Sequence, residues 1–228
     1  MPYAPIKGDR GDLGSELMRP RVIINAAMSV DGKIALVGGK RIKISDEEDF
    51  RRVHELRNSV DAILVGINTV LMDDPKLTVK EKFVEEPKNP VRIVVDSNLR
   101  IPSTARVLND MAKTIIATTE TAQERDLNAE IIRCGKKNVD LKCLLEELWK
   151  RGIRSIMVEG GGTVIYSFLK EGLVDELNVF VGSIIIGGNA PTLAEDIGAR
   201  NEDEVIKLKL LECRPLGYGV LLRYGVEK

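Results

Sequence analysis

Short apolar segments rich in β-branched residues recur along most of the chain and are separated by polar stretches. Each of them is too short for a buried helix and has the length of a strand. We therefore predict buried strands over 21–28, 62–65, 91–96, 114–118, 130–133 and 155–158, with a longer strand over 176–186.

Between these segments, apolar residues recur at helical spacing. Residues 140–151 carry four leucines on one helical face and are followed by Gly152, a typical helix stop. A capping box begins at Ser45, the predicted N-cap, and the helix that it opens is expected to end near Asn58. Shorter helices are predicted over 68–71, over 121–128, and from the glycine run at 160–162 to Lys170.

The order of the elements predicts the fold class. Strands alternate with helices up to about residue 186, and two alternating runs at 205–211 and 219–224 then predict an antiparallel hairpin. We expect one α/β domain over 20–228, with a mixed, mostly parallel sheet flanked by helices. Residues 1–19 are rich in Gly, Pro and charge and are expected to form a flexible N-terminal tail.

Charge excludes two classes of partner. The 228 residues hold 34 basic and 35 acidic side chains, and the net charge of −1 argues against nucleic-acid or anionic-membrane binding. No apolar run reaches the roughly 18–20 residues that span a bilayer, and the N-terminus lacks the apolar core of a signal peptide. A cytoplasmic location is expected.

Cysteine and histidine are scarce. Cys134, Cys143 and Cys213 show no CxxC spacing, so we expect small buried apolar side chains and no disulfide framework. His54 is the single histidine and is expected on a helix surface. A zinc site or a Ser-His-Asp triad is therefore not expected, because the residues that form such sites are nearly absent.

The strongest local motif is EGGGT at 159–163, between a predicted strand and a predicted helix. Glycines allow close backbone approach, and the following helix N-terminus offers free N–H groups to a phosphate. The motif is neither GxGxxG nor a P-loop, and a tightly packed turn is the alternative. From the residues alone, we expect a phosphate- or dinucleotide-binding α/β domain. Glu159 lies at a strand end where such sheets bind ligands, and a solvated loop acid is the alternative interpretation.

Taken together, several segments resemble one family. They are INAAMSVDGKIA at 24–35, ISDEEDFRRVHELR at 44–57, DAILVGINTVLMDDPKLTVK at 61–80, PVRIVVDSNLRIP at 90–102, VEGGGTVIYSFLKEGLVDEL at 158–177 and IIIGGNAPTL at 184–193. In this order they resemble the riboflavin-biosynthesis reductases, whose fold is similar to that of dihydrofolate reductase. The resemblance runs from Pro20 to the C-terminus.

The resemblance is to the stand-alone archaeal type, which is also similar to the fungal enzyme, because no segment with the zinc-ligand spacing of a deaminase precedes it. That type uses NADPH to reduce 2,5-diamino-6-ribosylamino-4(3H)-pyrimidinone 5′-phosphate before deamination. Asn25 supports this branch, since bacterial bifunctional proteins tend to have Lys there. The deaminated uracil substrate, a pteridine or folate reductase of the same fold, and a non-catalytic dinucleotide-binding module are the alternatives. A homodimer is also implied.

The family's site residues transfer to matching positions of this sequence. The cofactor positions are Thr69, Asp73, Ser97, Gly160, Gly161, Gly162, Thr163, Val164 and Ile165. The substrate positions are Ser45, Arg57, Leu77, Lys80 and Glu159. NADH is left open as the cofactor, with Ser97, Thr118 and Thr119 as candidate ligands of a 2′-phosphate.

The chemistry that these assignments imply is a hydride transfer to the sugar. Arg57 and Lys80 would neutralise the substrate's 5′-phosphate. We expect the ribosylamine to open to an imine, C1 to take the hydride and O4 to take a proton, with Glu159, Asn25 or a water moving that proton. Asp31 and Lys33 are further catalytic candidates, with a purely turn-forming role as the alternative.

Overall fold

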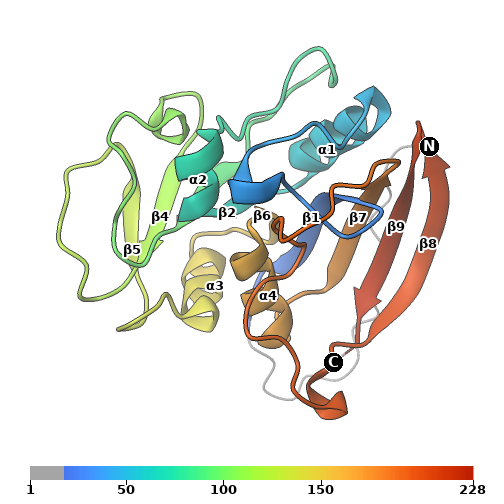
Figure 1. Cartoon of the computed structure of the whole chain (residues 1–228). Coiled ribbons are helices and arrows are strands. Elements are labelled where there is room, and N and C mark those ends of the chain that lie inside the picture. The colour runs from blue at the N-terminus through green and yellow to red at the C-terminus, as the bar shows by residue number, and fades with distance from the viewer. Residues whose placement is uncertain (1–17, 228) are drawn as a thin grey trace.

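A twisted sheet runs through the computed structural model, which describes residues 18–227 (Figure 1). Within that range it has nine strands in the order β5-β4-β3-β2-β6-β1-β7-β9-β8. Their bounds are β1 Arg21–Ser29, β2 Ala62–Gly66, β3 Val91–Val95, β4 Thr114–Thr118, β5 Glu130–Arg133, β6 Ser155–Gly160, β7 Glu176–Gly182, β8 Leu208–Leu216 and β9 Gly219–Val226.

The helices are α1 Glu47–Ser59, α2 Ile67–Asp73, α3 Leu141–Lys150 and α4 Gly162–Lys170, with short 3-10 turns at Val37–Gly39, Arg106–Leu108 and Glu202–Glu204. Strands β1 to β7 pair in parallel, whereas β9 is antiparallel to β7 and β8 is antiparallel to β9. The predicted mixed α/β sheet with a C-terminal antiparallel hairpin is confirmed.

Two apolar cores lie on the two faces of the sheet. Alternate β1 residues take part in both, because Ile23 belongs to the core under α1 and α2 while Ile24 belongs to the core under α3 and α4. Figure 1 shows the two helix pairs on opposite sides of the sheet. This arrangement makes the sheet interior strongly apolar, as parallel strands that are covered on both faces require.

The N-terminus of α1 differs from the prediction. Asp46, not Ser45, is the N-cap, and its carboxylate accepts from the Asp49 backbone N–H at 2.9 Å. The Ser45 hydroxyl instead donates to the Asp49 side chain. A carboxylate at this position also complements the positive end of the helix dipole, which explains why the acid takes the cap.

The helix predicted over 121–128 is wrong, because this segment is a loop. The Arg125 guanidinium donates to the carbonyls of Leu99 and Ile101, both at 2.6 Å, and the Asn128 amide donates to the Leu108 carbonyl at 2.8 Å. Side-chain contacts with a neighbouring loop therefore hold this stretch in an irregular path, against its local propensity.

Three other boundaries differ from the sequence pattern. The helix predicted over 68–71 is longer, since α2 covers Ile67–Asp73, and the long strand predicted over 176–186 ends at Gly182. A Cβ at Gly182 would lie 2.8 Å from Ile44 Cγ2, and the chain then turns so that Val30 N–H donates to the Ile184 carbonyl. The first hairpin strand, predicted over 205–211, is shifted to Leu208–Leu216.

The cysteine and histidine predictions also need correction. Cys134 and Cys143 form a disulfide, with their Cα atoms 5.9 Å apart, and Cys213 is exposed and not buried. The spacing of these two cysteines in the sequence does not predict the disulfide, because only the packing of β5 against α3 brings them together. His54 is 3 % exposed, so it does not lie on the surface.

The predicted flexible tail mostly lies outside the described residues. Arg19, at its end, donates two hydrogen bonds to the Asp175 carboxylate, both at 2.8 Å. Among the helices of residues 18–227, none has the length and apolar character to cross a membrane.

Candidate active site

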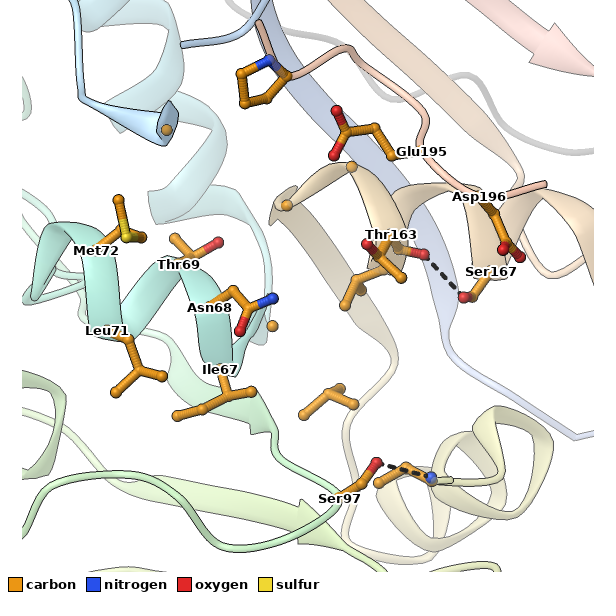
Figure 2. Close-up of a pocket in the computed structure, with 18 of the residues that line it drawn as sticks. Ile67, Asn68, Thr69, Leu71, Met72, Ser97, Thr163, Ser167, Glu195 and Asp196 are labelled. Carbon is orange, nitrogen blue, oxygen red and sulfur yellow. Dashed lines mark hydrogen bonds between the residues drawn. The ribbon is translucent and has the colours of Figure 1, made fainter. Parts of the chain in front are cut away.

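The candidate site lies where two neighbouring strands are followed by helices that pack on opposite faces of the sheet. Strands β2 and β6 are paired, but α2 packs into one core and α4 into the other. Ligands bind at such a switch point, outside the carboxyl ends of the strands. A cavity of about 880 Å³ lies at this point, and we call it the α2–α4 cavity (Figure 2).

Both helices turn their N-termini toward this cavity. Gly66 is the N-cap of α2 and Gly161 the N-cap of α4, and no side chain in the described range caps either helix. A Cβ at Gly66 would lie 2.7 Å from Val164 Cγ2, so glycine is required for the two helix starts to lie side by side. Free backbone N–H groups and two positive dipole ends make this edge suited to an anion.

Most of the residues predicted to bind the cofactor line this cavity. They are Thr69, Asp73, Ser97, Gly161, Gly162, Thr163 and Val164. Figure 2 shows Thr69 on α2 and Thr163 on α4 on facing walls, with Ser97 beyond the end of β3. Ile165 is instead part of the core under α3 and α4, with 1 % exposure. Gly160 is not among the lining residues and lies beside the Thr69 hydroxyl.

The structure adds lining residues that the sequence did not single out. They come from α2, from α4 and from loops distant in the chain, and include Ile34, Ala35, Gly39, Asn68, Met72, Arg100, Asn138, Val139, Ser167, Glu171, Pro191, Glu195 and Asp196. The Ser97 hydroxyl accepts from the Val139 backbone N–H at 3.3 Å, which joins two of these loops (Figure 2). Thr118 and Thr119 do not line the cavity, and both hydroxyls donate to the Ser97 carbonyl.

Acidic side chains outnumber basic ones around the cavity. Four carboxylates line it, and Arg100 is the cation among the described lining residues. Burial, reinforced by the charge of Asp140, raises the pKa of Glu171. The positive potential for a phosphate therefore comes from the two helix N-termini and from Arg100, which also donates to the Asn68 side chain at 3.1 Å.

A second group of predicted residues gathers beside the cavity around Glu159, two residues before Gly161. The Arg57 Nε and Nη2 groups donate to the two Glu159 carboxylate oxygens, each at 2.6 Å, and Arg57 Nη1 donates to the Thr78 carbonyl at 2.9 Å. The two side chains are 17 % and 12 % exposed. Three of the guanidinium donors are thus engaged within the protein, so Arg57 is less free for a substrate phosphate than its position in the sequence suggests.

His54 holds the loop that carries Lys80. Its Nδ1 accepts from the Lys80 backbone N–H at 3.2 Å, and its ring stacks on Phe83 with 4.9 Å between centroids. Burial, and then the positive charges of Arg57, Lys80 and Lys82, lower the pKa of His54 to about 4. The imidazole is therefore neutral at pH 7 and serves as an acceptor.

The other predicted substrate residues take different positions. Lys80 is exposed, so its ammonium is available to a ligand. Leu77 is buried in the core under α1 and α2, and Ser45 is buried with its hydroxyl on Asp49. The structure pairs Arg57 with Glu159, and His54, one turn before Arg57 on α1, holds the backbone of Lys80 in the loop after α2.

Asp31 and Lys33 shape a turn against another loop. The Asp31 carboxylate accepts from the Ser29 hydroxyl and from the backbone N–H groups of Ile186 and Gly187. These hydrogen bonds lower the pKa of Asp31 to about 2. Lys33 pairs with Thr192 in an isolated bridge. Both residues therefore position the loops at the cavity rim.

Asn25 lies on the same face of the sheet as Glu159. The parallel register of β1 and β6 pairs Ile23 with Met157 and Ile24 with Val158. Asn25 and Glu159 are the next residues on the two strands, so they lie beside each other. Ile23 and Met157 both belong to the core under α1 and α2, and side chains two residues along a strand share a face. The catalytic candidates Glu159 and Asn25 are thus neighbours beneath α1.

The chain matches one family model and several named proteins. The model described as the RibD C-terminal domain matches residues 20–222. The chain is 48 % identical, over 92 % of its length and 100 % of the relative, to a 2,5-diamino-6-ribosylamino-4(3H)-pyrimidinone 5′-phosphate reductase of Methanothermobacter thermautotrophicus. A protein of the same name from Archaeoglobus fulgidus is 47 % identical over 78 % of this chain and 87 % of the relative.

Solved structures of proteins from the same biosynthetic route share the fold of this chain. The structure of Acinetobacter baumannii RibD has a TM-score of 0.81 at 26 % identity, and the match covers 92 % of this chain and 59 % of RibD. The Saccharomyces cerevisiae riboflavin biosynthesis reductase Rib7 shares the fold, with a TM-score of 0.74 at 24 % identity over 94 % and 93 % of the two chains. The chain therefore belongs to the RibD C-terminal domain family of riboflavin-biosynthesis reductases, with a dihydrofolate reductase-like fold.

Proposed function

We propose that this chain reduces the ribosyl side chain of 2,5-diamino-6-ribosylamino-4(3H)-pyrimidinone 5′-phosphate to the ribitylamino product, with NADPH as the reductant. Relatives that bear the name of this reductase are 48 % and 47 % identical to the chain. The observation that carries the proposal is the Arg57–Glu159 pair directly beside the α2–α4 cavity, with Lys80 on the adjoining loop.

The cavity fits a nicotinamide dinucleotide. The paired helix N-termini at Gly66 and Gly161 would hold the pyrophosphate, and Thr69, Thr163 and Val164 would line its path. When bound, the cofactor supplies a hydride. We propose NADPH over NADH because Arg100 and Ser97 offer a cation and a hydroxyl at the far end of the cavity, suited to an extra phosphate.

The substrate site would lie on the Glu159 side of the cavity. Lys80, which is exposed, would contact the 5′-phosphate, and Arg57 would fix the Glu159 carboxylate beside the sugar. Glu159 would orient the opened sugar chain and move a proton at O4, with Asn25 next to it. His54 would act indirectly, because it fixes the backbone of Lys80.

The deaminated uracil analogue is the second candidate substrate. Proteins named RibD are also relatives, among them the Escherichia coli protein at 32 % identity, with 89 % of this chain and 59 % of RibD covered. Asn25, in place of the Lys that we expect in bacterial proteins, favours the diaminopyrimidinone. A pteridine reductase or a dinucleotide-binding module would not need the arrangement of Lys80, Arg57 and Glu159.

The test is oxidation of NADPH by the purified protein, followed by its absorbance, with each of the two ribosyl phosphates in turn. We expect NADPH to be oxidised only when a ribosyl phosphate is also present, and faster with the diaminopyrimidinone than with the deaminated compound. A preference for the deaminated compound would place the enzyme after deamination. Tight NADPH binding without oxidation in the presence of either compound would support the binding-module alternative.

We further propose that the protein is a cytoplasmic homodimer of the archaeal type. The β8 edge of the sheet exposes Leu208, Leu210 and Leu211, which is an unusual apolar content for an unprotected edge. Sedimentation equilibrium of the full chain measures the mass directly, and a monomer at micromolar concentration would contradict the dimer.

A further inference from the structure

We propose that Arg125 positions Arg100 for the 2′-phosphate of NADPH and thereby helps to select NADPH over NADH. The inference rests on the proposed function, in which Arg100 is the cation that meets this phosphate. Arg125 is not among the residues that line the α2–α4 cavity, so it acts through Arg100 as a positioning residue. The irregular segment 121–128, whose sequence predicts a helix, acquires a role in this way.

The loops that carry the two arginines leave the same edge of the sheet. Arg100 lies in the loop after β3, and Arg125 lies in the loop after β4. Since β3 and β4 are adjacent and parallel, both loops start at the carboxyl ends of their strands. Ligands bind at this edge of such sheets, so the second loop is placed to support the first beside the cavity.

One nitrogen of Arg125 holds the backbone on both sides of Arg100. Its Nη1 group donates to the Leu99 carbonyl and to the Ile101 carbonyl, each at 2.6 Å. Hydrogen bonds from a charged donor are shorter and stronger than those between neutral groups. A single guanidinium therefore fixes both ends of the short segment that carries Arg100.

The backbone at Arg100 follows a path that needs such support. Leu99 has a φ of 49°, in the left-handed region that a leucine rarely adopts. The side chains of Leu99 and Ile101 belong to the core under α1 and α2, whereas half of the Arg100 side chain is exposed. The loop thus directs Arg100 outward between two buried anchors, and Arg125 binds the carbonyls of these two anchors.

The guanidinium of Arg100 is also held on its own side of the loop. Its Nε lies 4.0 Å from Asp96 Oδ1, and its Nη2 donates to the Asn68 side chain at 3.1 Å. Asp96 is 0 % exposed, and its Oδ2 accepts from the Ile101 backbone N–H at 2.8 Å. Asp96 Oδ1 has no hydrogen-bond partner among residues 18–227, so its buried charge is left to attract Arg100.

Position matters for Arg100 because the cavity offers no substitute for it. Arg100 is the cation among the described lining residues, and four carboxylates line the same cavity. A displaced Arg100 would leave an added phosphate among acidic side chains. Fixing the cation before the ligand arrives also reduces the entropy that is lost on binding. The support from Arg125 should therefore count for NADPH and not for NADH.

The experiment compares kcat/KM for NADPH with kcat/KM for NADH in the unaltered protein, Arg125→Ala, Arg100→Ala and the double variant. We expect Arg125→Ala to lower this ratio by about 5-fold, through KM for NADPH and with kcat unchanged. The double variant should have the ratio of Arg100→Ala alone, because it lacks the side chain that Arg125 positions.

A second readout does not depend on turnover. Calorimetry gives the Kd of adenosine 2′,5′-bisphosphate and of 5′-AMP, which differ in the 2′-phosphate. Arg125→Ala should weaken binding of the bisphosphate by about 5-fold and leave that of 5′-AMP unchanged. Arg125→Lys keeps the charge and N–H donors, so it should recover most of the bisphosphate affinity.

The matched control is Arg154→Ala. Arg154 Nη1 also donates to two backbone carbonyls, those of Trp149 and Ile153, and Arg154 does not line the cavity. This variant should leave both the cofactor ratio and the bisphosphate affinity as they are. If Arg125→Ala does not fold, Arg125→Met keeps the apolar stem without the donors, and the same measurements decide with that variant.

The outcomes separate this inference from the proposed function. A ratio that falls in Arg100→Ala but not in Arg125→Ala overturns the inference alone, as does an equal loss of affinity for both adenosine phosphates, which indicates a purely structural role. An unchanged ratio in Arg100→Ala overturns it as well. Failure to oxidise NADPH with either ribosyl phosphate contradicts the proposed function, and the two adenosine phosphates then still decide the role of Arg125.

Discussion

Arg57 on α1 and Glu159 at the end of β6, 102 residues apart in the chain, form a bidentate ion pair with both hydrogen bonds at 2.6 Å. The pair is largely removed from water and lies where the strand turns into the glycine-lined cavity. A planar guanidinium fork holds a carboxylate in one orientation more firmly than an ammonium would. The arrangement therefore positions the acid that the proposed reaction requires.

The first prediction concerns this pair. Glu159→Gln leaves the Arg57 charge without its partner and should lower the free energy of unfolding by about 3 kcal/mol. It also removes the carboxylate, so kcat should fall by about 100-fold. Chemical denaturation and steady-state kinetics measure the two effects.

The control for Glu159 is a surface acid. Glu147→Gln breaks exposed contacts with Lys150 and Arg151 and should leave turnover as it is. Near-normal kcat in Glu159→Gln would remove Glu159 from the chemistry.

A second prediction uses the single histidine. Because the pKa of His54 is lowered to about 4 from 6.5, the unfolded chain takes up a proton below pH 6.5 while the folded protein does not. The stability that neutral His54 contributes is present above pH 6.5 and is lost as the pH falls toward 4. The ring resonances of the one histidine in an NMR titration report the pKa directly.

The matched variant for that titration is His54→Asn, which should show a smaller loss of Tm between pH 6.5 and about 4 than the unaltered protein. The same variant loosens the Lys80 backbone and should raise KM for the phosphorylated substrate more than it lowers kcat. An imidazole that titrates near its ordinary pKa would contradict the neutral, buried state.

The third prediction addresses the choice of cofactor. Arg100 lines the cavity near Ser97, with half of its side chain exposed. Arg100→Ala should raise KM for NADPH by about 10-fold and leave KM for NADH nearly unchanged, because only NADPH carries the additional phosphate. Arg106→Ala, outside the cavity lining, is the control. Equal effects on both cofactors would place the 2′-phosphate elsewhere.

The fourth prediction concerns the disulfide between Cys134 and Cys143. It closes the short loop that contributes Asn138 and Val139 to the cavity wall. Loss of this cross-link in Cys143→Ser should lower the free energy of unfolding by about 2–3 kcal/mol, as expected for a loop of this length. We also expect weaker NADPH binding, measured by fluorescence titration.

Cys213→Ser provides the control for that variant, because Cys213 is exposed and free. Addition of a dithiol reductant to the unaltered protein should reproduce the Cys143→Ser result and leave Cys143→Ser itself unaffected. If the reductant changes neither Tm nor NADPH binding, the cross-link does not support the cavity.

Local patterns in the sequence predicted the helices and strands whose formation depends only on residues close to one another in the chain. The leucine spacing of α3 and the apolar runs of β4 and β5 predicted these elements at their observed positions. Likewise, the glycine run after β6 predicted an anion-binding helix start, because uncapped N–H groups arise from the local geometry alone. The resemblance then placed Thr69, Ser97 and Thr163, and the structure gathers them at one cavity.

The sequence by itself determined the alternation of strands and helices and the chemistry available at the strand ends, since both follow from periodicity and residue type over a few neighbours. Tertiary structure decided which of these ends meet. It set α2 and α4 on opposite faces of adjacent strands, buried His54, paired Cys134 with Cys143, and bound Arg125 to the backbone on both sides of Arg100. Such contacts depend on the order of strands in the sheet, which no spacing along the chain encodes.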